Sequence, residues 1–134
     1  MQVTAPNTRP VLVVDDDPHI REFLCDALGD EGYPVVAAAD GAEALDRLEG
    51  LLPVRPGLIL LDMNMPVLDG WGFAGAYRQF PSPAGHAPIV VCTAAHAAPR
   101  CAAEVGADGF LSKPFDLSAL FHILERYTAV DRAA

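Results

Sequence analysis

In the stretch LILLDMNMP, residues 58–66, four consecutive apolar residues are followed directly by Asp62. A strand this apolar is expected to be buried on both faces, as the parallel strands of α/β proteins are. Because Asp often ends strands and caps turns, the plain interpretation of Asp62 is a turn residue. The alternative is a reactive carboxylate held where buried strands open onto a crevice, and the rest of the chain decides between the two.

Four more short apolar runs recur along the chain, and apolar residues at helical spacing follow them. They are VLVV (11–14), PVVAA (34–38), IVVCT (89–93) and GFLS (109–112). Capping residues mark three helix starts, which are Asp17 before Pro18, Asp40 with Glu43, and Asp116. Pro99 and Gly106 leave room for only a short helix between the last two strands. Five strands alternating with five helices predict an α/β domain whose parallel sheet is covered on both faces.

Composition narrows the class of protein and its partners. With 134 residues, 51% of them hydrophobic, the chain is long enough for one well-buried domain and too short for two. Its formal net charge of −9 argues against a nucleic-acid-binding surface. No apolar run approaches the length of a membrane span, and the first ten residues lack the apolar core of a signal peptide. Cys25, Cys92 and Cys101 form no CxxC pair, which predicts reduced thiols in a cytoplasmic protein.

Polar residues gather at the predicted carboxyl ends of four strands. They are Asp15 and Asp16 after the first strand, Asp62 after the third, Thr93 at the end of the fourth and Lys113 after the fifth. Each alone has a plain explanation as a helix cap, a turn residue or a solvent-facing side chain. In a parallel α/β sheet, however, ligands bind beyond these ends, near the point where the strand order reverses. We therefore expect three carboxylates, a hydroxyl and an ammonium group to share one rim.

Such a rim has a defined chemistry. Two unit charges about 4 Å apart repel by roughly 4 kcal/mol at an effective dielectric constant near 20, so three close carboxylates need a cation. Hard oxygen ligands in a partly hydrated pocket suit Mg²⁺. A carboxylate beside Mg²⁺ and a lysine is a plausible nucleophile toward phosphorus. The metal, the ammonium and the hydroxyl would then stabilise the charge on the phosphoryl oxygens.

Four segments, in this order along the chain, resemble the receiver domain of the two-component response-regulator family. They are VLVVDDDPHIRE (11–22), LILLDMNMPVLDGW (58–71), PIVVCTA (88–94) and GADGFLSKPF (106–115). The resemblance covers residues 10–128 and implies a flavodoxin-like (βα)5 fold with strand order 2-1-3-4-5. Residues 1–9 are expected to form a loose N-terminal segment, and residues 129–134 a loose C-terminal tail.

The resemblance implies roles for the residues at the rim. Asp62 would accept a phosphoryl group. Asp15, Asp16 and Asp62 would hold Mg²⁺, with Mn²⁺ or Ca²⁺ as substitute ions. The backbone carbonyl of Asn64 would be a further metal ligand.

The resemblance also implies a switch. Thr93 and Lys113 would contact the phosphoryl group. Phe110 stands where the family places a switching aromatic residue, and the alternative is a permanently buried core phenylalanine. The peptide bond before Pro114 is a candidate cis bond. The interval from Thr93 to Lys113 is shorter than is usual in the family and contains Pro99, so we expect an atypical loop and helix after the fourth strand.

These roles together describe a phosphoacceptor that is not an enzyme beyond its own uptake and release of the phosphoryl group. Its partners would be a histidine kinase or a histidine phosphotransfer protein, and a downstream protein that contacts the face of the fourth helix, fifth strand and fifth helix. Neither nucleic acid nor a membrane is expected as a partner. No segment after Tyr127 is long enough for an output domain, which predicts a stand-alone module.

Several alternatives stay open on the sequence alone. The chain could be a receiver cut from a longer regulator, or a degenerate receiver that binds partners without phosphorylation. An aspartate-nucleophile phosphatase also passes through an aspartyl-phosphate, but Asn64 stands where such an enzyme has its acid and cannot protonate a leaving group. A flavin-binding module is disfavoured because no Gly-rich or Ser/Thr-rich phosphate loop follows the first strand.

Overall fold

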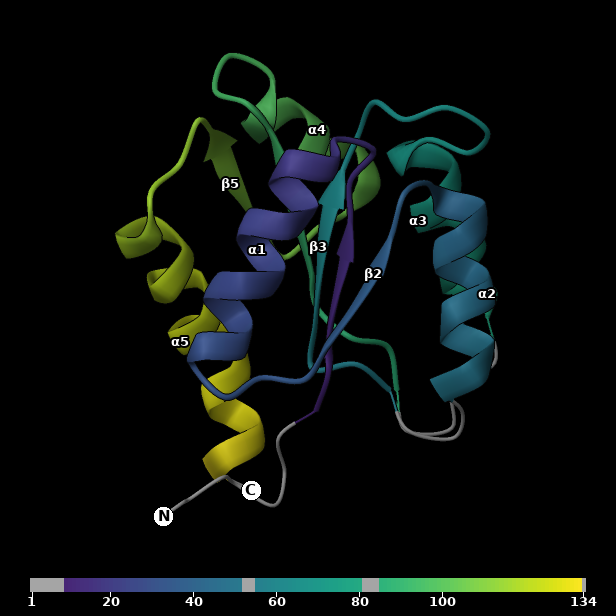
Figure 1. Ribbon diagram of the computed structural model, residues 1–134. Helices are drawn as coiled ribbons and strands as arrows, with labels where there is room; N and C mark the ends of the chain where they lie inside the picture. Colours follow the sequence, from purple (N-terminus) through teal and green to yellow (C-terminus); the bar gives the residue numbers. More distant parts are fainter. Residues whose placement is uncertain (1–8, 52–54, 81–84, 134) are drawn as a thin grey trace.

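The computed structural model describes residues 9–51, 55–80 and 85–133, with side chains described as far as Thr128. Five parallel strands form one sheet in the order β2-β1-β3-β4-β5, which is the predicted order (Figure 1). The strands are β1 (Val11–Val14), β2 (Val35–Ala38), β3 (Leu58–Asp62), β4 (Ile89–Ala94) and β5 (Gly109–Lys113). The expected loose segment 1–9 lies outside the described residues except for Arg9.

Helices cover both faces of this sheet. They are α1 (Pro18–Asp30), α2 (Gly41–Leu51), α3 (Gly70–Arg78), α4 (Ala98–Val105) and α5 (Leu117–Ala133). Helices α1 and α5 lie on one face, and α2, α3 and α4 lie on the other (Figure 1). Consecutive residues of a strand point to opposite faces, so Val11 and Val13 pack under α1 and α5 while Leu12 and Val14 pack under the other three helices. This double burial explains why the central strands β1 and β3 are continuously apolar up to the carboxyl end of the sheet.

The predicted capping residues begin their helices. The Asp17 carboxylate accepts the backbone N–H of His19 at 2.9 Å, and the Asp116 carboxylate accepts that of Ala119 at 2.9 Å. At α2, the Asp40 carboxylate accepts the backbone N–H of Glu43 at 2.8 Å. In return, the Glu43 carboxylate accepts the backbone N–H of Ala39 at 2.7 Å. These bonds satisfy backbone donors that lack a partner inside the helix.

Helix α4 is short, as predicted. Pro99 lies in its first turn, where a missing N–H costs no helical hydrogen bond. Gly106 ends the helix with a φ of 64°, a left-handed conformation that glycine adopts without a steric penalty.

Helix α5 is longer than the sequence predicted. Its backbone stays helical to Ala133, whereas a loose tail was expected from residue 129. The apolar residues of this helix from Leu117 to Tyr127 defined the predicted face, and helical hydrogen bonding continues for six residues beyond it. Among the described residues, no helix is both long enough and apolar enough to cross a membrane.

Candidate functional site

The carboxyl ends of β1, β3 and β5 bring four charged side chains together. Asp15 follows β1, Asp62 is the last residue of β3, and Lys113 is the last residue of β5. One carboxylate oxygen from each of Asp15, Asp16 and Asp62 lies within 4.8 Å of the others, a grouping that could hold a metal ion. Asp15 and Asp62 are buried, with 2% and 6% of their surface exposed, and Asp16 is exposed. The rim predicted from the sequence is therefore present for these residues.

Lys113 is the cation at the centre of this cluster. Its Nζ atom donates to Asp15 Oδ2 at 2.8 Å and lies 3.4 Å from Asp62 Oδ1. The shorter contact is to Asp15, which the resemblance assigns to the metal alone, and the longer one is to Asp62, the predicted phosphoacceptor. In this structure the ammonium group thus compensates the negative charge that a bound cation would otherwise neutralise.

The carboxylate of Asp62 is under-compensated. Its pKa is raised from 3.8 to about 6, chiefly by burial and then by the negative charge of Asp15, with a smaller contribution from Asp16, while the charge and hydrogen bond of Lys113 partly offset the increase. A raised pKa means that the folded protein disfavours the ionised form, so adding a cation at this point should be favourable. For Lys113, burial lowers the pKa, but the hydrogen bond and charge of Asp15 and the charge of Asp62 outweigh burial and leave it raised. Lys113 therefore stays charged at neutral pH.

The remaining predicted site residues occupy the same end of the sheet. Thr93 is buried in β4, one residue beyond Cys92, which pairs in register with Asp62. Within the described residues, no hydrogen bond joins Thr93 to Asp62. Asn64 is an exposed residue of the loop after β3. The Lys113–Pro114 peptide bond is cis.

Phe110 lies on β5 with 43% of its surface exposed. The alternative of a permanently buried core phenylalanine is therefore wrong for this structure. Strand β5 pairs with β4, so that Phe110 lies opposite Val91 and Ser112 lies opposite Thr93. The Phe110 ring is therefore on the strand next to the one that carries Thr93.

The loop after Asp62 is tightly built. Gly70 at the start of α3 donates its N–H to the carbonyl of Met63 at 2.9 Å. A Cβ atom on Gly70 would lie 2.7 Å from Met63 Cα and 2.8 Å from the carbonyl oxygen of Asp62. Val67, in the loop between Met63 and Gly70, is 81% exposed. Its φ of 68° is a left-handed conformation that costs a β-branched residue of the order of 1–3 kcal/mol. The loop that carries Asn64 is held in this shape by contacts at both of its ends.

The contacts of three side chains were not foreseen from the sequence. Arg21 of α1 donates to the backbone carbonyl of Asp15 at 2.8 Å. The indole N–H of Trp71 on α3 donates to Glu104 on α4 at 2.9 Å. The side chain of Arg78, at the other end of α3, donates to the carbonyls of Val105 and Gly106. No spacing pattern signals such contacts, because each joins residues that do not belong to the same helix or strand.

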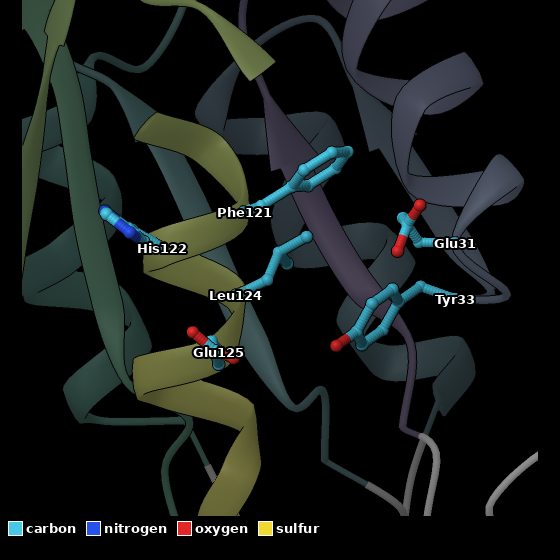
Figure 2. A pocket seen from close by; sticks show the side chains of 6 residues that line it. All are labelled: Glu31, Tyr33, Phe121, His122, Leu124 and Glu125. Carbon is cyan, nitrogen blue, oxygen red and sulfur yellow. The ribbon is translucent and has the colours of Figure 1, made fainter. Parts of the chain in front are cut away.

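A separate pocket of about 300 Å³ lies away from this cluster. In Figure 2, Phe121 and Leu124 of α5 face Glu31 and Tyr33 of the loop that precedes β2. His122 and Glu125 complete its lining. Because Tyr33 precedes β2, this pocket is at the amino-terminal edge of the sheet, opposite the carboxylates.

The fold and these residues match a known family and known proteins. Residues 11–125 match the family model described as the response regulator receiver domain. The response regulator MprA of Mycobacterium sp. (strain KMS) is 42% identical over 112 residues, covering 82% of this chain and 46% of MprA. The chain therefore spans about half the length of the curated relatives it matches.

Solved structures agree. The chemotaxis response regulator CheY4 of Vibrio cholerae is 37% identical, with a TM-score of 0.74 over 90% of this chain and 98% of that one. The receiver domain of the sensor histidine kinase PA1611 from Pseudomonas aeruginosa PAO1 is 28% identical, with a TM-score of 0.75 over the same shares of the two chains. That structure has a magnesium ion coordinated in its active site cleft.

Proposed function

The chain belongs to the response regulator receiver domains of two-component systems, and on that premise we propose that Asp62 accepts a phosphoryl group from a histidine kinase or a histidine phosphotransfer protein. The observation that carries the proposal is the meeting of three carboxylates and one ammonium group at the ends of three strands. Asp62 is buried and poorly compensated, and Lys113 reaches it from β5. A degenerate receiver would have no need to retain so costly a set of charges.

The donor set fits a hard divalent cation. Asp15, Asp16 and Asp62 offer oxygen ligands from side chains that lie within 4.8 Å of one another, and burial of two of them makes the cluster short of positive charge. Mg²⁺ is the ion we propose, with Mn²⁺ or Ca²⁺ as substitutes and the Asn64 carbonyl as a further ligand. The magnesium in the PA1611 receiver supports this assignment. When bound, the ion would neutralise negative charge on the phosphoryl oxygens.

The protein's own residues would perform the transfer. An ionised Asp62 oxygen forms a bond to phosphorus while the bond from phosphorus to the partner's imidazole nitrogen breaks. The Lys113 ammonium and the Thr93 hydroxyl would donate to the phosphoryl oxygens and stabilise the charge that they carry. Because the group ends on the protein itself, the reaction is uptake and later release on Asp62, without turnover of an external substrate.

Labelling with a small phosphodonor tests the proposal. Acetyl phosphate and Mg²⁺ should add one phosphoryl group, measured as intact mass, and digestion should place it on the peptide containing residues 58–69. The product should be labile to base and to hydroxylamine, as an acyl phosphate is. A label on another peptide, or no label at any Mg²⁺ concentration, would contradict the proposal.

Mg²⁺ should stabilise the folded protein. An ion that binds only the native state raises the unfolding free energy with concentration, by about 2.7 kcal/mol at 100 times its Kd. Asp16→Ala should lose this increase, measured as melting temperature against Mg²⁺ concentration, while keeping its fold, because the Asp16 side chain is exposed. The control is Asp26→Ala, an exposed aspartate of α1, which should respond as the wild type does. A wild-type response in Asp16→Ala would place the metal elsewhere.

The phosphodonor is proposed to dock around the carboxylates. Exposed apolar side chains stand on the segments that surround this end of the sheet, and such side chains mark protein contacts. They are Phe23 of α1, Leu117 at the start of α5, Val67 after β3 and Trp71 at the start of α3. The ring of Phe23 also contacts Phe115, 6.2 Å away between centroids, so α1 and the segment before α5 form one surface.

The downstream partner is proposed to contact the face of α4, β5 and α5. Phosphorylation should draw Thr93 toward Asp62 and let Phe110 turn inward, since alanines follow Thr93 and leave little bulk in the way. Amide chemical shifts with beryllofluoride, a phosphoryl mimic, test this coupling. Wild-type changes should extend through residues 94–106 to Phe110, and those of Thr93→Ala should stay near Asp62. Changes confined to the metal site in both proteins would remove the coupling.

A further inference from the structure

Arg21 joins helix α1 to the loop that carries two of the proposed metal ligands. Its side chain is half-buried, and Nη1 donates to the carbonyl oxygen of Asp15 at 2.8 Å. That oxygen belongs to the peptide group between Asp15 and Asp16. The guanidinium group therefore fixes the plane of the peptide from which Asp16 extends.

Asp15 and Asp16 are held in different ways. The Asp15 N–H donates to the Ala38 carbonyl at 3.1 Å, and its Oδ1 and Oδ2 accept from the Asp17 N–H and from Lys113 at 2.9 and 2.8 Å. The Asp16 carboxylate is exposed and, within the described part of the chain, has neither a hydrogen bond nor an ion pair. The direction of Asp16 consequently depends on its backbone, and the preceding peptide is bonded to Arg21.

We propose that Arg21 is a positioning residue for the metal site, which directs Asp16 toward Asp15 and Asp62 through the carbonyl of Asp15. This inference rests on the proposed function, because it presumes that the three carboxylates bind a cation. A charge-assisted hydrogen bond is about twice as strong as a neutral one and keeps a ligand in place before the ion arrives. Mutation of a residue that orients a metal ligand without touching the metal typically lowers metal affinity by about 10–100-fold.

An effect of the Arg21 charge and an effect of its hydrogen bond to the peptide predict opposite changes in Mg²⁺ affinity when Arg21 is replaced. If the guanidinium group acted only by its positive charge, removing it would lessen repulsion of Mg²⁺ and tighten binding. If it acts by holding the peptide, removing it frees Asp16 and weakens binding. The sign of the change in affinity therefore separates the two effects, and a loss of fold stability alone would not produce it.

The experiment measures the Kd for Mg²⁺ in the whole chain by titration, following backbone amide shifts around residues 15, 16 and 62. Arg21→Ala should weaken binding by roughly 10-fold or more. Arg21→Lys keeps the charge but loses the planar fork, so it should also weaken binding. The control Arg126→Ala removes the same charge from an exposed position in the second half of α5, which runs away from the carboxyl end of β5, and it should bind as the wild type does.

Each outcome has a defined meaning. If Arg21→Ala is not folded by its amide spectrum, Arg21→Lys decides the question. Equal or tighter binding in the folded Arg21 variants than in Arg126→Ala would overturn the positioning role and leave the proposed function intact. A wild type with no saturable Mg²⁺ binding would instead overturn the proposed metal site, and the inference with it.

Discussion

Asp62→Asn should take up no phosphoryl group from acetyl phosphate under conditions that label the wild type to one group per chain. An amide is a poor nucleophile, so the variant lacks the atom that would form the bond to phosphorus. Intact-mass measurement in Mg²⁺ gives the result directly. Asp46→Asn, in which an exposed carboxylate of α2 is replaced, should be labelled normally and controls for the loss of one acid. Normal labelling of Asp62→Asn would remove Asp62 from the role of acceptor.

The same variant should be more stable than the wild type at neutral pH. The pKa of Asp62 is raised in the fold from 3.8 to about 6, mainly by burial and then by Asp15. The folded state therefore holds a proton that the unfolded state has lost between these values, and stability falls as the pH rises through that window. A shift of about two pKa units corresponds to at most about 3 kcal/mol, a cost that asparagine does not carry.

Melting temperatures without divalent ions, measured at pH 5 and at pH 8, test the sign. The excess stability of Asp62→Asn over the wild type should be roughly half of its full size at pH 5, because the unfolded chain has then already lost the proton that the folded Asp62 keeps, and it should grow by several °C at pH 8. Saturating Mg²⁺ should reduce the difference, because the ion compensates the ionised carboxylate only in the wild type. A stability difference that is the same at both pH values would mean that ionisation of Asp62 does not destabilise the fold.

The sequence was sufficient for the architecture because the central strands β1, β3 and β4 are buried on both faces. A strand that is buried on both faces must consist of apolar residues along its whole length. The first polar residue after such an apolar run therefore marks the end of the strand. Asp62 could therefore be located at the rim before its neighbours were known. The rule that parallel strands end at one edge then brought Asp15 and Lys113 to it.

Distances within the rim did not follow from that rule. The sequence could not indicate that Lys113 lies nearer to Asp15 than to Asp62, at 2.8 against 3.4 Å, because this depends on side-chain rotamers and on charge balance. The Arg21 contact was equally hidden, since its acceptor is a backbone carbonyl, which every residue possesses. The apolar face predicted for α5 also stopped at Tyr127, although backbone hydrogen bonding does not require an apolar face to continue.

Gly70→Ala should be the most destabilising small substitution near the site. The added Cβ would lie 2.6 Å from Met63 Sδ, 2.7 Å from Met63 Cα and 2.8 Å from the carbonyl oxygen of Asp62, and two of these atoms are backbone. Helix α3 would have to move away from β3, which stretches the bond from the Gly70 N–H to the Met63 carbonyl. We expect a loss of roughly 2–3 kcal/mol in urea unfolding, as overpacking typically costs.

Gly75→Ala in the same helix isolates the cause. A Cβ on Gly75 meets nothing within 4 Å, and the residue is exposed, so alanine should stabilise the fold by roughly 0.5–1 kcal/mol through helix propensity. The two variants make the same chemical change, and Gly70, as the first residue of α3, has less helix propensity to gain than Gly75 in the interior. A loss of stability in Gly70→Ala would therefore come from the contact of Gly70 with the end of β3. Phosphoryl uptake should fall in Gly70→Ala alone, since that contact includes the backbone of Asp62. Equal stability of the two variants would show that helix α3 can move away from the acceptor loop at little cost.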